Sequence, residues 1–140
     1  MTRPLLSLVM ILKNEARSIQ QVLETVKPYI GSWTILVDSD TIDETSEIVV
    51  EALAGIPGNI YYDEFHGYAA QRNLVMQLSQ GVVHLGDLER VGLDSTAKPQ
   101  ITPEQRGIFS LMLSGDEYLR NGAALCAFLE KYRDSQIDAF

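Results

Sequence analysis

Apolar residues occur along the chain in two arrangements, short continuous runs and the spacing of an amphipathic helix. The first continuous run extends from Leu5 to Leu12 and has the length and composition of a strand buried on both faces. From residue 15 to 27 the apolar positions recur every three or four residues, which predicts a helix that Asn14 can cap and Pro28 ends. The chain is therefore predicted to begin with a strand followed by a helix.

The same order then repeats. Trp33 to Val37 is a second predicted strand, and the Ser/Thr-x-x-Glu pattern of Thr41 to Glu44 predicts a capping box at the start of a second helix. A third strand is predicted over residues 59–65 and a third helix over 68–81, ended by Gly81. Such alternation predicts an α/β fold in which a mostly parallel sheet is flanked by helices.

The pattern weakens between residues 82 and 106, which we interpret as a loop or insertion. Within it, residues 82–85 resemble a short strand and a helix start is expected near Thr102. A further apolar run then meets Asp116 and Glu117, and an amphipathic helix is predicted from Leu119 to Tyr132. We expect residues 1–140 to form a single domain.

Composition narrows the class of protein. The net charge of −8 works against a nucleic-acid partner, because binding to phosphate backbones depends on Lys and Arg. Cys126 is the one cysteine, so no intrachain disulfide forms and a reducing compartment is favoured. The first apolar run is too short to cross a bilayer. We therefore expect a cytoplasmic protein without an integral membrane segment.

Polar residues follow the predicted strands directly, at the edge where parallel α/β sheets bind ligands. Those after the first three strands are Lys13, Asn14, Glu15, Asp38, Ser39, Asp40 and Asp63. Asn14 has two interpretations, a helix cap or a ligand contact, and Thr41 to Glu44 are assigned to the helix start. Asp116 and Glu117 supply the hard oxygen ligands that Mg²⁺ or Mn²⁺ prefers.

Four segments, taken in order, resemble the first half of the GT-A family 2 glycosyltransferases. They are "LSLVMILKNEARSIQQVLETVKPYI", "ILVDSDTIDETSEIV", "FHGYAAQRNLVMQLSQG" and "LMLSGDEYLRNGAALCAFLEKYRDSQIDAF". The resemblance implies a Rossmann-like GT-A nucleotide-binding fold, a nucleoside-diphosphate sugar donor and a divalent cation held by an Asp-x-Asp motif. It also implies that this chain is the donor-binding part, and that the base that activates the acceptor lies after Phe140.

The resemblance also implies roles for particular residues. The segments Leu12 to Glu15 and Asp38 to Asp40 would flank the base and ribose, and Arg72 would lie near the diphosphate. Asp116 matches the last aspartate of the metal motif, with Glu117 beside it. The catalytic residues, the acceptor and the donor sugar stay unassigned, and an uncovered sheet edge or apolar surface would favour a homo-oligomer.

Three departures from the family pattern leave alternatives open. Ser114 stands where the family has the first aspartate of the metal motif, and Asp40 and Thr41 replace a Gly-Ser pair. Asp87 and Glu89, in the insertion, form a second candidate pair of metal ligands. A module that binds a nucleotide sugar without catalysing transfer is therefore the alternative function.

Overall fold

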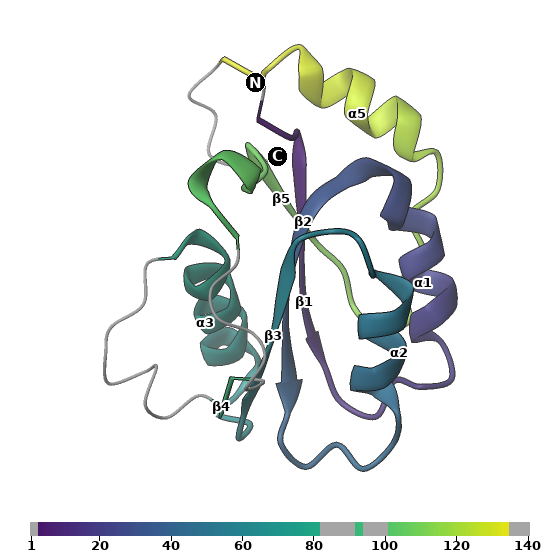
Figure 1. The fold of residues 1–140 in the computed structure, drawn as a ribbon, viewed down its shortest axis with the longest axis vertical. Helices are drawn as coiled ribbons and strands as arrows, with labels where there is room; N and C mark the ends of the chain where they lie inside the picture. Colours follow the sequence, from purple (N-terminus) through teal and green to yellow (C-terminus); the bar gives the residue numbers. More distant parts are fainter. Residues whose placement is uncertain (1–2, 82–91, 94–100, 135–140) are drawn as a thin grey trace.

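Four parallel strands form the centre of the protein. The computed structural model describes residues 3–81, 92–93 and 101–134. In this part of the chain the strand order is β4-β3-β2-β1-β5 (Figure 1). The strands are β1 (Leu6–Leu12), β2 (Ile30–Asp38), β3 (Gly58–Asp63), β4 (Gly92–Leu93) and β5 (Phe109–Met112). Only β4 runs antiparallel to its neighbour, β3, and the predicted α/β, Rossmann-like class with a mostly parallel sheet is confirmed.

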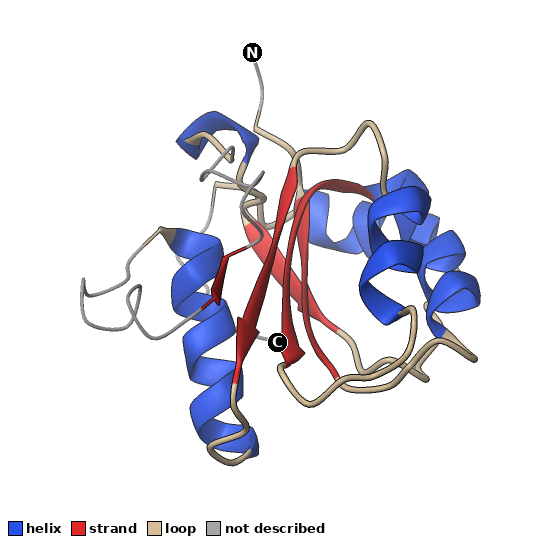
Figure 2. Cartoon of the chain, turned by 60° about the horizontal axis from the view of Figure 1, so that its bottom comes forward, coloured by secondary structure: helices blue, strands red, loops and turns tan. Residues whose placement is uncertain are grey.

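Helices cover both faces of this sheet (Figure 2). The α-helices are α1 (Ile19–Val26), α2 (Thr45–Ala52), α3 (Tyr68–Gln80) and α5 (Gly122–Glu130), and the short 3₁₀ helices are η1 (Lys27–Tyr29) and η2 (Pro103–Gln105). In Figure 1, α1, α2 and α5 lie to the right of the strands and α3 lies to their left. The sheet is thus the middle one of three layers.

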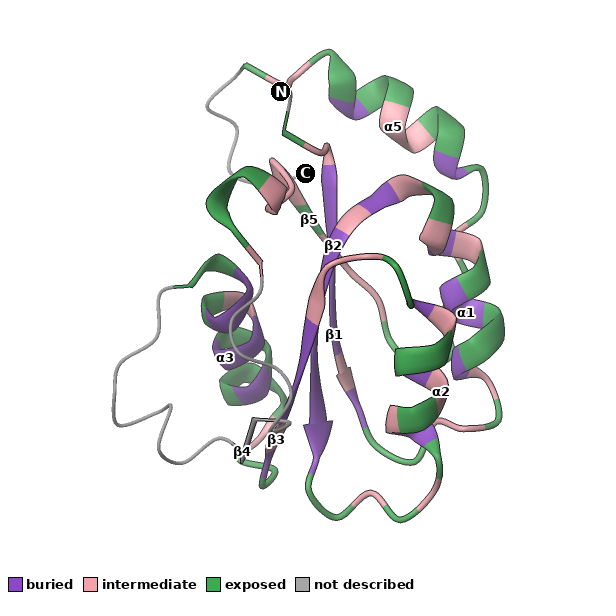
Figure 3. Cartoon of the chain, in the orientation of Figure 1, coloured by how far each residue is buried: buried purple, intermediate pink, exposed green. Residues whose placement is uncertain are grey.

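The core consists of two apolar clusters, one on each face of the sheet. Leu8 and Met10 of β1 belong to the cluster beneath α1, α2 and α5, whereas Val9 belongs to the cluster beneath α3. Because successive side chains of a strand point to opposite faces, burial on both sides requires a continuous apolar run. Figure 3 shows this burial along β1 and β2, the central strands.

Two predicted helix starts are wrong. Helix α1 begins after Ser18, and Asn14 instead adopts a left-handed conformation (φ 50°) and accepts a hydrogen bond from Ile42 N. Helix α2 begins at Thr45, after the predicted capping box of Thr41 to Glu44. These residues form the loop between β2 and α2, and the first free N–H of the helix, that of Thr45, donates to Asp43 Oδ1.

The third helix agrees closely with its prediction. Helix α3 ends at Gln80 and Gly81 follows in the left-handed conformation (φ 70°), where glycine is favoured. The helix expected near Thr102 is only the 3₁₀ turn η2, and α5 is shorter than the predicted segment Leu119 to Tyr132. The strand-like residues 82–85 lie outside the described residues.

Candidate functional site

The carboxyl ends of β1, β2 and β5 bring most of the predicted site residues to one edge of the sheet. Residues 13–15 follow β1, residues 38–40 follow β2 and residues 114–117 follow β5. Because β1 lies between β2 and β5, these three loops are neighbours. Arg72 lies near the start of α3, at the same edge. The structure thus brings these segments together at one edge of the sheet.

Two adjoining pockets open at this edge. The first, which we call the strand-end pocket, has a volume of about 340 Å³ and is lined by Lys13, Glu15, Asp38, Phe65, Tyr68 and Gln71 among others. The second, the arginine-glutamate pocket, has a volume of about 460 Å³ and includes Arg72, Ser114 and Glu117. Ile11, Glu15 and Tyr68 line both pockets. A ligand with two parts can therefore extend from one pocket to the other.

Asp38 supplies a buried carboxylate to the strand-end pocket. Its side chain is 8% exposed, and its Oδ1 accepts a hydrogen bond from Asp40 N at 2.9 Å. Its Oδ2 lies 3.9 Å from Lys13 Nζ. Asp38 thus orients its own loop with one oxygen, whereas the other lies near the exposed Lys13 side chain, where a ligand donor can approach.

Gln71 supplies a buried amide to the same pocket. The residue is 4% exposed, and its Oε1 has no hydrogen-bond partner among the described residues. A buried amide without a partner costs free energy, and a ligand donor would remove that cost. Nearby, the rings of Phe65 and Tyr68 form an edge-on pair with centroids 5.0 Å apart, and both are exposed. The pocket therefore combines polar recognition groups with an aromatic wall.

Glu15 lies between the two pockets in a negative environment. Burial raises the pKa of its carboxyl, and the charges of Asp116 and Asp43 raise that pKa further. Gly115 packs directly against it, since a Cβ on Gly115 would collide with the Glu15 side chain. A cation near Glu15 and Asp116 would relieve this repulsion.

Thr45 and Asp43 hold the loops after β1 and β2 together. Thr45 Oγ1 accepts a hydrogen bond from Glu15 N at 2.9 Å and donates to Asp43 Oδ1. Asp43 Oδ2 accepts from Ala16 N at 3.1 Å. The hydrogen bond from Thr45, followed by those from backbone N–H groups, holds the pKa of Asp43 below its usual range. The position of Glu15 therefore depends on the first residue of α2.

The loop after β5 closes on itself. Glu117 Oε1 accepts a hydrogen bond from Ser114 N at 2.8 Å, and this bond is the main reason why the pKa of Glu117 is lowered. The Glu117 side chain is thus committed to a turn, whereas Asp116 is exposed. No group of three or more His, Cys, Asp or Glu residues in the described part of the chain is arranged to hold a metal ion. Mg²⁺ at this edge would need ligand phosphates in addition to protein carboxylates.

Other predicted site residues lie at the rim. Asn14, Ser39 and Asp40 are exposed and do not line either pocket. Asp87 and Glu89, the alternative metal ligands, lie outside the described residues. Ser39 N donates to the Asp63 carbonyl at 2.9 Å, which joins the loops after β2 and β3.

The strand-end pocket also contains three residues that the sequence did not predict for the site, namely Phe65, Tyr68 and Gln71. The sequence does contain one signal, since Tyr68 and Gln71 lie about one helical turn apart at the start of α3, and Gln71 directly precedes Arg72. His66 lies in the loop between β3 and α3, and its Nε2 is 3.6 Å from Asp63 Oδ1.

The chain is thus an α/β protein of Rossmann-like fold with a two-part pocket at the carboxyl edge of its sheet. No known protein-family profile matches the sequence, and no curated protein does. Within the described residues, none of the helices has the length and apolar character needed to cross a membrane.

Proposed function

We propose that the chain binds a nucleoside-diphosphate sugar and is the donor-binding part of a metal-dependent glycosyltransferase with a GT-A fold. The observation that carries the proposal is the pair of adjoining pockets, which together contain Lys13, Glu15, Asp38, Arg72 and Glu117 from four different segments. The resemblance of four sequence segments to family 2 glycosyltransferases points to the same ligand class.

The strand-end pocket suits the nucleoside. The Asp38 carboxylate can accept from a base N–H or a ribose hydroxyl, and the Gln71 amide can both donate and accept. Phe65 and Tyr68 offer aromatic surface for a base. About 340 Å³ lies within the range of small-molecule sites.

The arginine-glutamate pocket suits the diphosphate only together with a cation. Among the described residues that line it, Arg72 supplies the one guanidinium, whereas Glu15 and Glu117 both carry negative charge into it. A diphosphate would be repelled by these carboxylates unless a divalent cation were present. Asp116, with Glu15 and Glu117 nearby, would hold Mg²⁺ or Mn²⁺ jointly with the phosphates, and the cation would offset charge on the departing diphosphate.

Thermal melting of the purified chain tests this proposal. We expect UDP or GDP, or one of their sugar conjugates, to raise the melting temperature with Mn²⁺ and to lose that effect with EDTA. A ligand at about a hundred times its dissociation constant stabilises the folded state by about 2.7 kcal/mol. No shift with any nucleotide, with or without Mn²⁺, would contradict the proposal.

Variants locate the site. Asp38→Asn and Arg72→Gln are expected to weaken nucleotide binding about tenfold or more, because each removes a charged hydrogen-bonding group. Asp116→Ala is expected to abolish the Mn²⁺ dependence, and Asp87→Ala to leave it unchanged; the reverse result would assign the metal to the insertion. Arg17→Gln, an exposed substitution in a residue that lines neither pocket, is the matched control.

A second function is a nucleotide-sugar-binding module without transferase activity. Two features favour it, the serine at position 114 and the hydrogen bond that commits Glu117 to Ser114 N. This module would bind the nucleotide sugar and release it unchanged. Transfer or hydrolysis of the sugar above the rate of a metal-only blank would eliminate this alternative.

A further inference from the structure

A separate pocket lies at the amino edge of the sheet, opposite the candidate functional site. It has a volume of about 280 Å³ and is lined by Arg3, Arg106, Gln80 and Ser110 among others, and we call it the arginine pocket. It shares no lining residue with the two pockets at the carboxyl edge. Among the described residues that line it, none is Asp or Glu. The concentration of positive charge here contrasts with the net charge of −8 of the whole chain.

Arg106 places a guanidinium in this pocket, and no described carboxylate neutralises it. Its Nε is buried and has no hydrogen-bond partner among the described residues. Within 3–81 and 101–134, no carboxylate forms an ion pair with it. A partly buried guanidinium that lacks an anionic partner is costly, so the site favours an incoming anion.

The carboxyl end of α3 offsets only part of the cost of the unpaired Arg106 charge. The Arg106 guanidinium lies against Gly81, because a Cβ there would collide with it. The carbonyl end of a helix attracts a cation, typically by less than about 1 kcal/mol at a surface. No hydrogen bond links Arg106 Nε to those carbonyls in the described part of the chain. The Nε–H of Arg106 is therefore a donor that the described residues do not satisfy.

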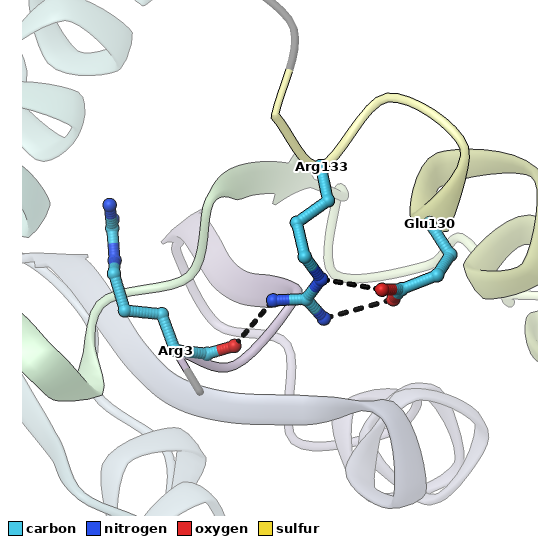
Figure 4. A network of polar contacts seen from close by, with 3 residues as sticks. All are labelled: Arg3, Glu130 and Arg133. Atoms are coloured by element: carbon cyan, nitrogen blue, oxygen red, sulfur yellow. Dashed lines mark hydrogen bonds and ion pairs between the residues drawn. The ribbon is translucent and has the colours of Figure 1, made fainter. Parts of the chain in front are cut away.

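Arg3 is held in place as a second cationic group. Its Nε and Nη2 donate to the carbonyl oxygens of Arg106 and Gly107, at 3.2 and 3.3 Å. Its own carbonyl accepts from Arg133 Nη1 at 2.8 Å, and Arg133 forms a two-pronged pair with Glu130 (Figure 4). In Figure 4 the Arg3 side chain extends away from Glu130, whose carboxylate is occupied by Arg133. Among the described residues no carboxylate forms an ion pair with Arg3, so its guanidinium adds positive charge to the pocket.

We propose that the arginine pocket binds the phosphate group of a small molecule. Two guanidinium groups lining one pocket repel each other, and an oxyanion between them converts repulsion into attraction. The planar fork of Arg matches phosphate in a two-pronged geometry, and Gln80 and Ser110, which also line the pocket, carry an amide and a hydroxyl that can donate. The adjoining hollow at Arg3 and Arg106 is also lined by Glu104, which disfavours an anion there and directs it to the arginine pocket.

The proposal does not depend on the function proposed for the carboxyl edge. It is tested by NMR titration of the ¹⁵N-labelled chain with inorganic phosphate at constant ionic strength, in the absence of nucleotide and metal. We expect saturable shifts at the amides of Gly107 and Ser110 and at the Nε–H of Arg106. Glucose 6-phosphate, added in a second titration, distinguishes the source: tighter binding assigns a phosphorylated metabolite, and equal binding assigns free phosphate.

Charge variants provide the control. Arg106→Gln is expected to weaken phosphate binding about tenfold or more, and Arg3→Gln to weaken it by a smaller factor. Arg17→Gln removes the same charge from an exposed part of the chain and is expected to leave binding unchanged. Arg106→Lys keeps the charge but loses the fork, so it should bind more weakly than the native chain even if Arg106→Gln does not fold.

Three results would overturn the proposal. They are shifts that grow without saturation, shifts that are equal in the native chain and in Arg106→Lys and Arg3→Gln, and shifts confined to Lys13 and Arg72. The last would assign phosphate to the carboxyl edge, and it would leave the proposed function intact.

Discussion

Glu15 shows how a single residue connects stability with the candidate site. It lines both pockets at the carboxyl edge, and burial raises the pKa of its carboxyl above the ordinary value of 4.5, with Asp116 and Asp43 adding to the effect. The folded chain therefore holds the Glu15 proton more tightly than the unfolded chain does. This contribution to stability is fully present below about pH 4.5 and is lost as the pH rises through the folded pKa.

Replacement of Glu15 by Gln should accordingly stabilise the chain near neutral pH. We expect the melting temperature of Glu15→Gln to exceed that of the native chain by a few degrees at pH 7 and the difference to shrink towards pH 4.5. Differential scanning calorimetry at several pH values measures it. Glu24→Gln, at an exposed position of α1, should show no such trend. A native chain that is the more stable at pH 7 would disprove the stated role of Glu15.

At the scale of elements, the start of α2 positions the loop after β1. Thr45 is fully buried, and its hydroxyl accepts from Glu15 N while donating to Asp43. Asp43 in turn accepts from Ala16 N. These hydrogen bonds join the β1–α1 unit to the β2–α2 unit. The position of Glu15, which lines both pockets at the carboxyl edge, therefore depends on α2 as well as on the loop that precedes α1.

Thr45→Val removes this hydroxyl at nearly constant volume. We expect the free energy of unfolding to fall by about 1–3 kcal/mol, because the Glu15 N–H loses its acceptor. Urea denaturation measures the loss, and Thr45→Ser, which keeps the hydroxyl and deletes only a methyl group, is the matched control. If the valine variant is as stable as the serine variant, the hydroxyl does not have the role assigned here.

At the scale of the whole molecule, the sheet divides the core into two clusters that share the same strands. Leu8 lies in the cluster beneath α1 and α2, and Leu36 lies in the one beneath α3. Because β1 and β2 contribute to both, loss of one layer exposes the other face of the same strands. The described residues should therefore unfold as one cooperative unit.

The single tryptophan gives a probe for this cooperativity. Trp33 is buried in β2, and its Nε1 donates to the Ile56 carbonyl at 2.9 Å. We expect its fluorescence and the far-ultraviolet circular dichroism to report one coincident urea transition. Leu8→Ala and Leu36→Ala should each lower the free energy of unfolding by about 2–5 kcal/mol and move both signals together. Separate transitions in either variant would show that the two layers unfold independently.

The sequence by itself determined the four parallel strands, their order along the chain and the end of α3. Continuous apolar runs require burial on two faces, and the left-handed position of Gly81 is a local property of one residue. It also determined the grouping of Asp38 with the segment after β1, because parallel strands end at a common edge. In each case the cause is either local or a direct result of strand direction.

Only the tertiary structure decided the starts of α1 and α2 and the full composition of the pockets. Asn14 was a good candidate cap, but its side chain accepts from Ile42 N, 28 positions away along the chain. Gln71 became a site residue only when α3 packed beside Asp38, and Arg3 met Arg106 across more than a hundred positions. Hydrogen bonds between loops and the sharing of a pocket depend on packing between distant segments, which local patterns of polarity do not contain.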